Sequence, residues 1–399
     1  MKRSEDHILT THVGSLIRPE KLIETAPTTI SAAFAGSSGH QLPYVGEVAY
    51  LDELKGDVAA IVAMQIDCGL DIVNDGEFGK SSWAAYILER ISGFEIHPER
   101  LKPLDWLGRD RERFKGFFAT SEMAAVVGGA PAEVCVGPIA YVDDSAVRRD
   151  LANLIAAGEA AGVGADDKEL FFTSVAPAST AYQGINEYYG SEEEYIFAIA
   201  DALAVEYKAV IDSGVILQVD DAVLANMYDY LVEQGESVYN RWAQLRVEAL
   251  NHALAGLPEE RIRYHICFGS WHVPHVADAP LEAIVPFMLQ VNAGAYSIEA
   301  ANPRHEHEWT VWEQNALPDG KILVPGVVTH HTTTVEHPAL VAQRLERFAA
   351  ILGRENVIGG TDCGFAQGAR IQRVHPEVMW AKFAALSEGA RLASEKLWR

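Results

Sequence analysis

A histidine and a cysteine two residues apart, His265 and Cys267, lie in a short apolar stretch of this sequence. Tyr264, Ile266 and Phe268 alternate with them, and aromatic and β-branched residues of this kind favour a strand. Because alternate residues of a strand point to the same face, the imidazole and the thiol would converge on one point. Such a pair supplies half of a zinc site. A buried cysteine more often only fills space, so the prediction of a metal depends on two further ligands.

Two further residues of ligand type, Glu299 and Cys363, lie at the ends of later strand-like stretches. A carboxylate inside an apolar strand is costly unless it is paired or binds a metal. Neighbouring strands lie about 4.8 Å apart, so the ends of three consecutive strands can surround one ion. Two thiolates, an imidazole and a carboxylate suit zinc. We therefore predict Zn²⁺ as the cofactor, held by His265, Cys267, Glu299 and Cys363.

A zinc ion with two thiolate ligands is a weak Lewis acid, but it can carry a third thiolate. A free thiol has a pKa of about 8.5 and is mostly protonated at neutral pH, whereas zinc deprotonates a bound thiol. The ligand set thus predicts a zinc-dependent thiol alkyltransferase, in which a small thiol attacks an electrophilic carbon. A zinc hydrolase and a binding protein with a closed structural zinc are the alternatives from other classes.

Polar residues near other strand ends are candidates for substrate binding and proton transfer. Asp220 either orients a substrate or caps a helix, and Arg304 with His305 either binds an anion or belongs to a solvated loop. His330 and His331 are the candidate general acids for the leaving group, against the alternative of a structural histidine pair.

The elements that would position these residues alternate along the chain. Eight strand-like stretches alternate with helical segments, at residues 7–16, 71–77, 133–138, 169–175, 215–221, 263–269, 295–300 and 356–363. This pattern predicts an α/β fold, a (β/α)8 TIM barrel in a single domain over residues 1–399, with an insertion after the second strand. A doubly wound open sheet is the alternative, but no G-x-G-x-x-G follows the first strand. We expect an excursion at residues 23–50, and a lid or oligomer contact at residues 78–130.

The composition excludes several classes of partner. The 399 residues carry a formal net charge of -24, which argues against nucleic acid and anionic membranes. Four cysteines in so long a chain fit a reducing compartment, and Cys68 and Cys135 are expected to fill the core. The sequence shows no signal peptide and no apolar run of about 20 residues. We expect a cytoplasmic homo-oligomer whose partners are a small thiol and an alkyl donor.

The ordered motifs of the chain resemble those of the catalytic barrel of cobalamin-independent methionine synthase. The resemblance is carried by THVGSL, DGE, QVDDA, HIC, IEA and TDCGF, which begin at residues 11, 75, 218, 265, 298 and 361. It implies a zinc site at the four residues named above. It also implies that Ser15, Glu77 and Asp220 hold the thiol substrate, and Asp220 is a catalytic candidate as well.

Departures from the family pattern bear on the substrates. Gly137-Pro138 is not followed by the family's folate-stacking tryptophan, and the family's Asp-Glu-Pro-Ala is DDAV here, from residue 220. The stretch from Glu299 to Trp309 is more similar to the single-barrel branch that includes epoxyalkane:coenzyme M transferase. Our first expectation is therefore epoxide opening by coenzyme M or a similar anionic thiol. The alternative is methyl transfer to homocysteine from a folate, a corrinoid or another methyl donor.

Overall fold

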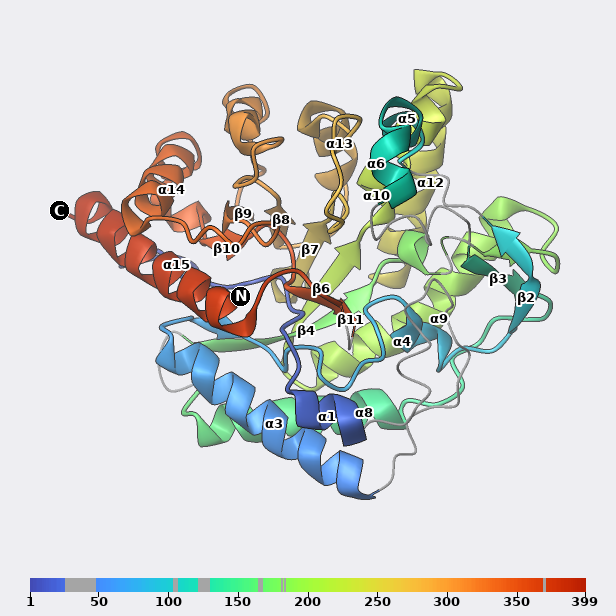
Figure 1. The fold of residues 1–399 in the computed structure, drawn as a ribbon, viewed down its shortest axis with the longest axis horizontal. Helices are drawn as coiled ribbons and strands as arrows, with labels where there is room; N and C mark the ends of the chain where they lie inside the picture. The colour runs from blue at the N-terminus through green and yellow to red at the C-terminus, as the bar shows by residue number, and fades with distance from the viewer. Residues whose placement is uncertain are drawn as a thin grey trace.

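The computed structural model describes residues 1–25, 48–102, 107–120, 130–163, 168–180, 182, 184–368 and 371–399. Its centre is a sheet of seven parallel strands in the order β1-β4-β6-β7-β8-β9-β10 (Figure 1). Parallel neighbours need long crossover connections, which here contain helices. The strands are β1 (Ile72–Val73), β4 (Glu169–Val175), β6 (Ile216–Asp221), β7 (Ile262–Ile266), β8 (Ala295–Ile298), β9 (Ile322–Val328) and β10 (Gly360–Thr361).

The N-terminal segment lies between the two edge strands of this sheet. Thr10 forms a parallel bridge with Gly359, next to β10, and Thr11 forms one with Ile72 of β1. The sheet therefore curls until both edges meet the same segment. A curled parallel sheet covered by helices is a TIM-barrel-like α/β fold, and at this level the predicted fold class is confirmed.

Two details of the predicted strand set are wrong. The third predicted strand, residues 133–138, does not join the central sheet: β3 (Ala130–Cys135) pairs with β2 (Phe94–Lys102) and β5 (Ile185–Asn186) in a separate sheet. In its place the central sheet contains β9, which the sequence pattern does not predict because Pro325 and Gly326 interrupt its apolar run. All residues of β9 are buried, so apolar packing on both faces helps to hold the strand in the sheet although proline lacks a ladder N–H.

Helices pack around the outside of the central sheet (Figure 1). Their sequences carry ordinary start signals: Ser191 caps α9 by accepting a hydrogen bond from the Glu194 N–H at 3.1 Å, and prolines open α14 and α15. The long helices are α3 (Val48–Asp67), α8 (Ser145–Ala160), α9 (Glu192–Asp212), α12 (Glu236–Ala253), α13 (Leu281–Met288), α14 (Pro338–Leu352) and α15 (Pro376–Leu397).

Shorter elements fill the connections. They are the α-helices α1 (Glu20–Thr25), α4 (Ala85–Leu88), α5 (Gly108–Arg113), α6 (Lys115–Thr120), α10 (Val223–Asn226) and α11 (Tyr228–Val232), the 3₁₀ helices η1 (Pro177–Ser179), η2 (Glu259–Arg261), η3 (Glu306–Glu313) and η4 (Arg354–Asn356), and the antiparallel strands β11 (Ala366–Gly368) and β12 (Ile371–Gln372).

The predicted excursion at residues 23–50 falls mostly on residues 26–47, which lie outside the described residues. The predicted insertion at 78–130 contains α4, β2, α5 and α6, and β3 begins at its end. Figure 1 shows β2 and β3 at the periphery, away from the central strands. Among the described residues, no helix has the length and apolar character needed to cross a membrane.

A buried arginine, Arg263, fills part of the interior beneath the carboxyl ends of the strands. Its guanidinium donates hydrogen bonds to Gln218 Oε1 (2.6 Å), Thr11 Oγ1 (2.9 Å) and the carbonyl of His12 (3.0 Å), and it packs over the ring of Phe171. Residues two apart on a strand share a face, so the side chain that follows Arg263 on its face is that of His265. The arginine thus forms a rigid support under one predicted metal ligand.

Candidate metal centre

Three of the four predicted ligands converge at the carboxyl ends of the central strands. His265 lies on β7, Cys267 follows β7 directly, and Cys363 lies two residues beyond β10. One ligand atom from each of the three lies within 4.8 Å of the other two, and all three residues are buried. Within the described part of the chain, this is the one group of histidine, cysteine and carboxylate side chains that meets this distance test.

The chemistry of the three residues fits a zinc ion. The Sγ atoms of Cys267 and Cys363 are 3.6 Å apart, while two sulfurs bound to one tetrahedral zinc at about 2.3 Å each lie about 3.8 Å apart. His265 is 1% exposed, yet neither of its ring nitrogens has a hydrogen-bond partner. A buried imidazole without partners is costly, and a metal ion would supply the missing interaction. Zinc, predicted as the cofactor, fits this site.

Neighbouring polar groups donate hydrogen bonds to the two sulfurs. Ser270 Oγ donates to the Sγ of Cys363 at 2.9 Å, and the Gly269 N–H points to the Sγ of Cys267 at 3.3 Å. Gly269 adopts a φ of +93°, which glycine tolerates and other residues rarely adopt. The hydrogen bond from Cys363, aided by His265, lowers the pKa of Cys267 well below its ordinary value. Ser270 could not be identified from the sequence, because a loop serine has no periodic pattern.

The fourth predicted ligand, Glu299, lies beside this group but is not part of it. Its Oε1 accepts a hydrogen bond from the Phe268 N–H (3.1 Å), and its Oε2 accepts one from Asn302 Nδ2 (2.8 Å). Burial raises the pKa of Glu299, and the nearby Cys267 adds to the effect. Its role as a ligand therefore stays a prediction.

The prediction that the ligands come from three consecutive strands is wrong, since β9 separates β8 from β10. At this point β9 and β10 approach closely: a Cβ atom on Gly326 would lie 2.6 Å from the backbone nitrogen of Asp362. Asp362 Oδ1 accepts hydrogen bonds from the N–H groups of Ala300 and Ala301, both at 2.8 Å. Gly326 interrupts the apolar pattern of β9 in the sequence, but in the fold it lets Asp362 approach closely. Asp362 can therefore hold the turn that carries Cys363.

Asp220 and Glu77 bring two carboxylates close to the metal centre. Asp220 pairs with His265 in the register of β6 and β7, and its Oδ1 accepts a hydrogen bond from Gln218 Nε2 at 2.6 Å. Burial raises the pKa of Asp220 to about 7, although His265 partly opposes the rise. Glu77 also contributes to this rise, which shows that the two carboxylates are neighbours.

Glu77 follows β1 in an unusual backbone conformation, with a φ of +60°. Its Oε1 accepts a hydrogen bond from Thr173 Oγ1 at 2.6 Å and lies 3.6 Å from the ammonium nitrogen of Lys80. Lys80 is itself buried and donates to the carbonyl of Thr173 at 2.7 Å. Left-handed backbone at a residue other than glycine is strained, and such strain is common at functional sites.

Ser15 lies against the turn that carries Cys363. The Phe365 N–H donates to the carbonyl of Ser15 at 2.8 Å, and a Cβ on Gly364 would lie 2.0 Å from Ser15 Oγ. Trp83 also lies at the metal centre, because it packs against an apolar group formed by Val13, Ala222, Cys267 and Cys363. Trp83 lies in the insertion predicted at residues 78–130, and nothing in its local pattern indicates contact with the metal centre.

Arg304 and His305, the predicted anion-binding residues, have different surroundings, and their role stays a prediction. Arg304 is exposed, and its guanidinium donates to the carbonyl of Val276 at 3.1 Å. His305 is buried between Glu308 Oε2 (2.7 Å) and Asp278 Oδ2 (3.2 Å). Burial alone would lower its pKa, but the hydrogen bonds to these carboxylates raise it to about 9.

His330 and His331 follow β9 and have the opposite surroundings. His330 is 0% exposed, and its two ring nitrogens have no hydrogen-bond partner; the Nε2 of His331 has none either. Burial, reinforced by neighbouring positive groups, lowers the pKa of His330 well below its ordinary value and that of His331 to about 3. These shifts favour the neutral imidazoles at pH 7 in the site without substrate, and the role of general acid stays a prediction.

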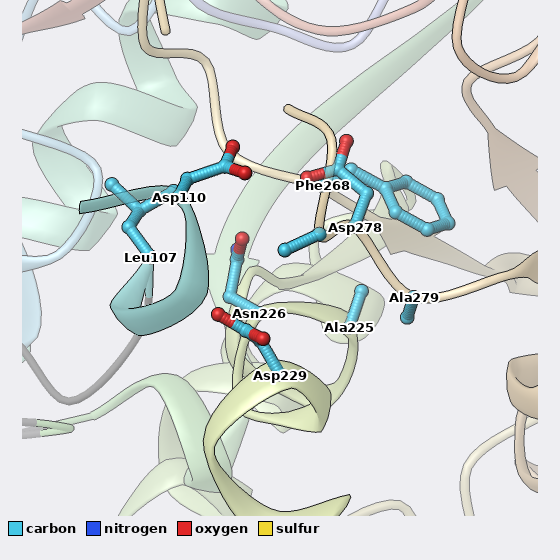
Figure 2. A pocket seen from close by; sticks show the side chains of 9 residues that line it. Leu107, Asp110, Ala225, Asn226, Asp229, Phe268, Asp278 and Ala279 are labelled. Atoms are coloured by element: carbon cyan, nitrogen blue, oxygen red, sulfur yellow. The ribbon is translucent and has the colours of Figure 1, made fainter. Parts of the chain in front are cut away.

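A small pocket lies next to the metal centre, lined by Asn226, Phe268 and three aspartates (Figure 2). Its volume is about 10 Å³, room for roughly one water molecule. Asn226 Nδ2 donates to the carbonyl of Cys267 at 3.3 Å, and each of the aspartates, Asp110, Asp229 and Asp278, accepts hydrogen bonds from the protein. The pocket therefore supports the ligand loop rather than offering space for a substrate.

The sequence of this chain is similar to those of one known protein family. The model of the family described as "Cobalamin-independent synthase, Catalytic domain" matches residues 180–385. The methionine synthase of Thermococcus kodakarensis is 21% identical over 361 residues, which cover 90% of this chain and 88% of that protein. The methionine synthase of Saccharolobus solfataricus is 23% identical over 394 residues, with coverage of 98% and 96%.

Solved structures agree at the level of the fold. A B12-independent methionine synthase from Shewanella sp. W3-18-1, in complex with selenomethionine, superposes with a TM-score of 0.71 at 20% identity, covering 98% of this chain and 99% of that one. A putative vitamin-B12 independent methionine synthase from Listeria monocytogenes gives a TM-score of 0.61 at 19% identity, with coverage of 96% and 98%. Since the family model spans more than half of its length, this chain belongs to the cobalamin-independent synthase catalytic-domain family.

Proposed function

We propose that this protein is a zinc-dependent methyltransferase that methylates the thiol of homocysteine. The single observation that carries the proposal is the convergence of His265, Cys267 and Cys363 at the carboxyl ends of the strands, in a member of this family. The relatives described above are methionine synthases, so the comparisons support the methyl-transfer alternative. They do not support our first expectation of epoxide opening by coenzyme M.

The charge of the site also favours homocysteine over coenzyme M. Asp220 and Glu77 are both buried or nearly so, and they accept hydrogen bonds from Gln218 and Thr173. Lys80 offsets part of the charge of Glu77, and Asp220 adds a second carboxylate. An amino-acid thiol brings an ammonium group, which such carboxylates attract, whereas coenzyme M brings a sulfonate, which they repel. We propose that Asp220 and Glu77 bind the ammonium group of homocysteine, and that Ser15 positions it from the Cys363 turn.

In this reaction, the protein's own residues would hold the zinc, exclude water and supply a proton. His265, Cys267 and Cys363 hold the zinc, with Glu299 as the proposed fourth ligand. When bound, zinc favours the thiolate form of the substrate, which is the nucleophile. Trp83 and the apolar group beneath it exclude water from the sulfur, because Val13 and Ala222 present only carbon. Exclusion of water keeps the thiolate reactive toward the methyl carbon.

The donor's leaving group needs a proton, and His330 and His331 stay the candidates for its delivery. A neutral His331, half-buried with an unpartnered Nε2, can relay a proton, whereas His330 is fully enclosed. We therefore propose proton relay for His331 and a supporting role for His330. The donor class, whether a folate, a corrinoid or another methyl compound, stays open.

The direct test is a panel of thiols and donors with zinc-loaded protein, read as methylated product by mass spectrometry. We expect methionine from homocysteine, and no product from coenzyme M or glutathione. Calorimetry in buffers of different ionisation enthalpy should also show release of about one proton per site when homocysteine binds, because its thiol binds as the thiolate. Proton-neutral binding of homocysteine, or product from coenzyme M alone, would refute the proposal.

A further inference from the structure

Two buried cations lie behind the two carboxylates that the proposed function assigns to the ammonium group of the substrate. Lys80 is 3% exposed, and Arg263 is 1% exposed. A buried positive charge is costly unless it is paired and hydrogen-bonded. The function proposed above gives neither cation a role in binding the substrate, so their contacts deserve to be followed one by one.

Lys80 reaches Glu77 through the hydroxyl group of Thr173. The ammonium group of Lys80 donates to Thr173 Oγ1 and, at 2.7 Å, to the carbonyl of the same residue. Thr173 Oγ1 lies 2.6 Å from Glu77 Oε1. An ammonium group can only donate and an ionised carboxylate can only accept. The hydroxyl hydrogen of Thr173 therefore points to Glu77, and the hydroxyl oxygen accepts from Lys80.

Packing fixes Thr173 as well. A Cβ atom on Gly14 would lie 2.7 Å from Thr173 Cγ2 and 3.5 Å from Glu77 Oε1. The absence of a side chain at Gly14 thus leaves room for the methyl group of Thr173, beside the carboxylate that its hydroxyl contacts. The backbone around Lys80 is also held, because Arg18 donates to the carbonyl of Lys80 at 3.0 Å and to that of Glu77 at 2.6 Å.

Arg263 reaches Asp220 in the same manner, through the amide of Gln218. Arg263 Nε donates to Gln218 Oε1 at 2.6 Å, and Gln218 Nε2 donates to Asp220 Oδ1 at 2.6 Å. A guanidinium group has no acceptor, so the amide oxygen must face Arg263 and the amide nitrogen must face Asp220. The direction of this amide is therefore decided by its neighbours, as is that of the Thr173 hydroxyl.

The two intermediate side chains are neighbours in the central sheet. Thr173 of β4 pairs with Gln218 of β6 in the parallel register, and the two residues are 1% and 0% exposed. Residues two apart on a strand share a face, so Asp220 lies on the same face of β6 as Gln218. The sheet thus sets the spacing of the two chains of contacts, and each cation sets the direction of one of them.

We propose that Lys80 and Arg263 are positioning residues for the recognition of the thiol substrate. Each cation acts on one carboxylate through one neutral side chain, and we call the two sets of contacts the lysine arm, Lys80–Thr173–Glu77, and the arginine arm, Arg263–Gln218–Asp220. Together the arms direct two carboxylates at the ammonium group of an amino-acid thiol. The inference rests on the proposed function, in which these carboxylates bind that group, and it adds the residues that make them specific for it.

A role in charge balance alone predicts a different outcome. If Lys80 only offset negative charge, Lys80→Met would make the site more negative and would improve the binding of an ammonium group. If Lys80 directs Glu77 through Thr173, its loss weakens that binding, because a misdirected hydrogen bond to a charged group loses much of its free energy. The two roles therefore differ in the sign of the effect.

Calorimetry with zinc-loaded protein measures this sign. We expect Lys80→Met to bind homocysteine about tenfold or more weakly than wild type. Lys382→Met is the matched control, because Lys382 is also a buried lysine, 0% exposed, and donates to Glu336 Oε2 at 2.9 Å. Its affinity for homocysteine should stay within about twofold of wild type. Unchanged or tighter binding of homocysteine by Lys80→Met would overturn the proposal.

A second variant keeps both charges and so protects the test against a failure of Lys80→Met to fold. Thr173→Val removes the hydroxyl group and breaks the lysine arm, so homocysteine should bind about fivefold or more weakly. The affinity for 4-mercaptobutanoate, which is homocysteine without its ammonium group, should stay within about twofold of wild type. Thr173→Ser keeps the hydroxyl group and should restore the binding of homocysteine to within about threefold. Equal losses with both thiols in Thr173→Val would assign Thr173 to folding and contradict the proposal.

The arginine arm allows an independent repeat. Gln218→Met removes the amide and keeps a side chain of similar length, whereas Arg263 itself also donates to Thr11 Oγ1 and to the carbonyl of His12. Homocysteine should again bind about fivefold or more weakly, and 4-mercaptobutanoate within about twofold of wild type. Wild-type discrimination between the two thiols in Gln218→Met would refute the arginine arm.

A measurement without substrate separates the lysine arm from the proposed function. Lys80→Met and Thr173→Val break the same arm, so their effects on the free energy of unfolding should be less than additive in the double variant. Additive effects would refute the lysine arm, whatever the thiols do. If the effects are less than additive but wild type binds homocysteine no more tightly than 4-mercaptobutanoate, the lysine arm stands as a support of Glu77 and the proposed function fails.

Discussion

Two corners of the same barrel end contain buried histidines without hydrogen-bond partners, and their neighbours differ in charge. His265 lies with two cysteine sulfurs and near Glu299, groups that are negative or become so. His330 lies near Arg373 and three other histidines. The same signal, an unpartnered buried imidazole, therefore occurs in two settings of opposite charge. In the described part of the chain, the group of side chains that could hold a metal is the one at His265, so the neighbouring groups decide which imidazole is a candidate ligand.

The largest expected effect is the loss of the metal from the first corner. Cys363→Ser removes one of two soft ligands, so zinc should fall from about one ion per chain to less than about 0.2 after dialysis. Elemental analysis measures this directly, and methyl transfer should fall with it. Cys68→Ser is the control, because Cys68 is a half-buried cysteine directly after α3, near Trp380, and is not part of the group that could hold the metal. Full zinc content in Cys363→Ser would remove the basis of the comparison.

A smaller effect tests whether charge also selects the thiol. Glu77→Gln keeps an oxygen that can accept from Thr173 but loses the negative charge, so the ammonium group of homocysteine should bind less well. We expect kcat/KM for homocysteine to fall about 10- to 100-fold. The rate with 4-mercaptobutanoate, which lacks the ammonium group, should change far less.

Glu133→Gln is the matched control for this variant. Glu133 is also a buried carboxylate, and burial raises its pKa to about 8, but it lies on β3 in the separate sheet. An equal loss with both thiols in Glu77→Gln would assign Glu77 to folding rather than to recognition.

The sequence was informative about the metal centre because strand alternation is a strong local signal. It predicted that His265 and Cys267 share a face, and Cys363 was identified by its position after an apolar stretch. The separate position of β3 and the presence of β9 were not predictable, because both depend on which strands pair. Gly326, which lets Asp362 approach, looks like a strand breaker when only the chain is read.

The loop residues of the site were the ones that the sequence did not predict. Ser270 and Trp83 have no periodic pattern, yet they contact the metal ligands. Arg304 and His305 looked like an anion site because of their residue types. The fold places two carboxylates around His305, and it places Arg373, which directly follows β12, near His330.

The smallest expected effect contrasts two histidines of opposite electrostatic surroundings through the pH dependence of stability. The pKa of His305 is about 9 in the folded protein, above the ordinary 6.5, so its contribution to stability is complete below pH 6.5 and is lost as the pH rises through 9. The pKa of His331 is about 3, below 6.5, so the unfolded chain binds the extra proton and stability falls as the pH drops from 6.5 toward 3.

One variant for each histidine should remove its dependence of stability on pH and leave the other dependence unchanged. His305→Gln should lower the free energy of unfolding by about 1–2 kcal/mol at pH 6 and by less at pH 9.5, and His331→Gln should flatten the decline below pH 6.5. Urea unfolding at a series of pH values measures both. An unchanged decline below pH 6.5 in His331→Gln, or an unchanged loss of stability above pH 6.5 in His305→Gln, would contradict the contrast between the two histidines.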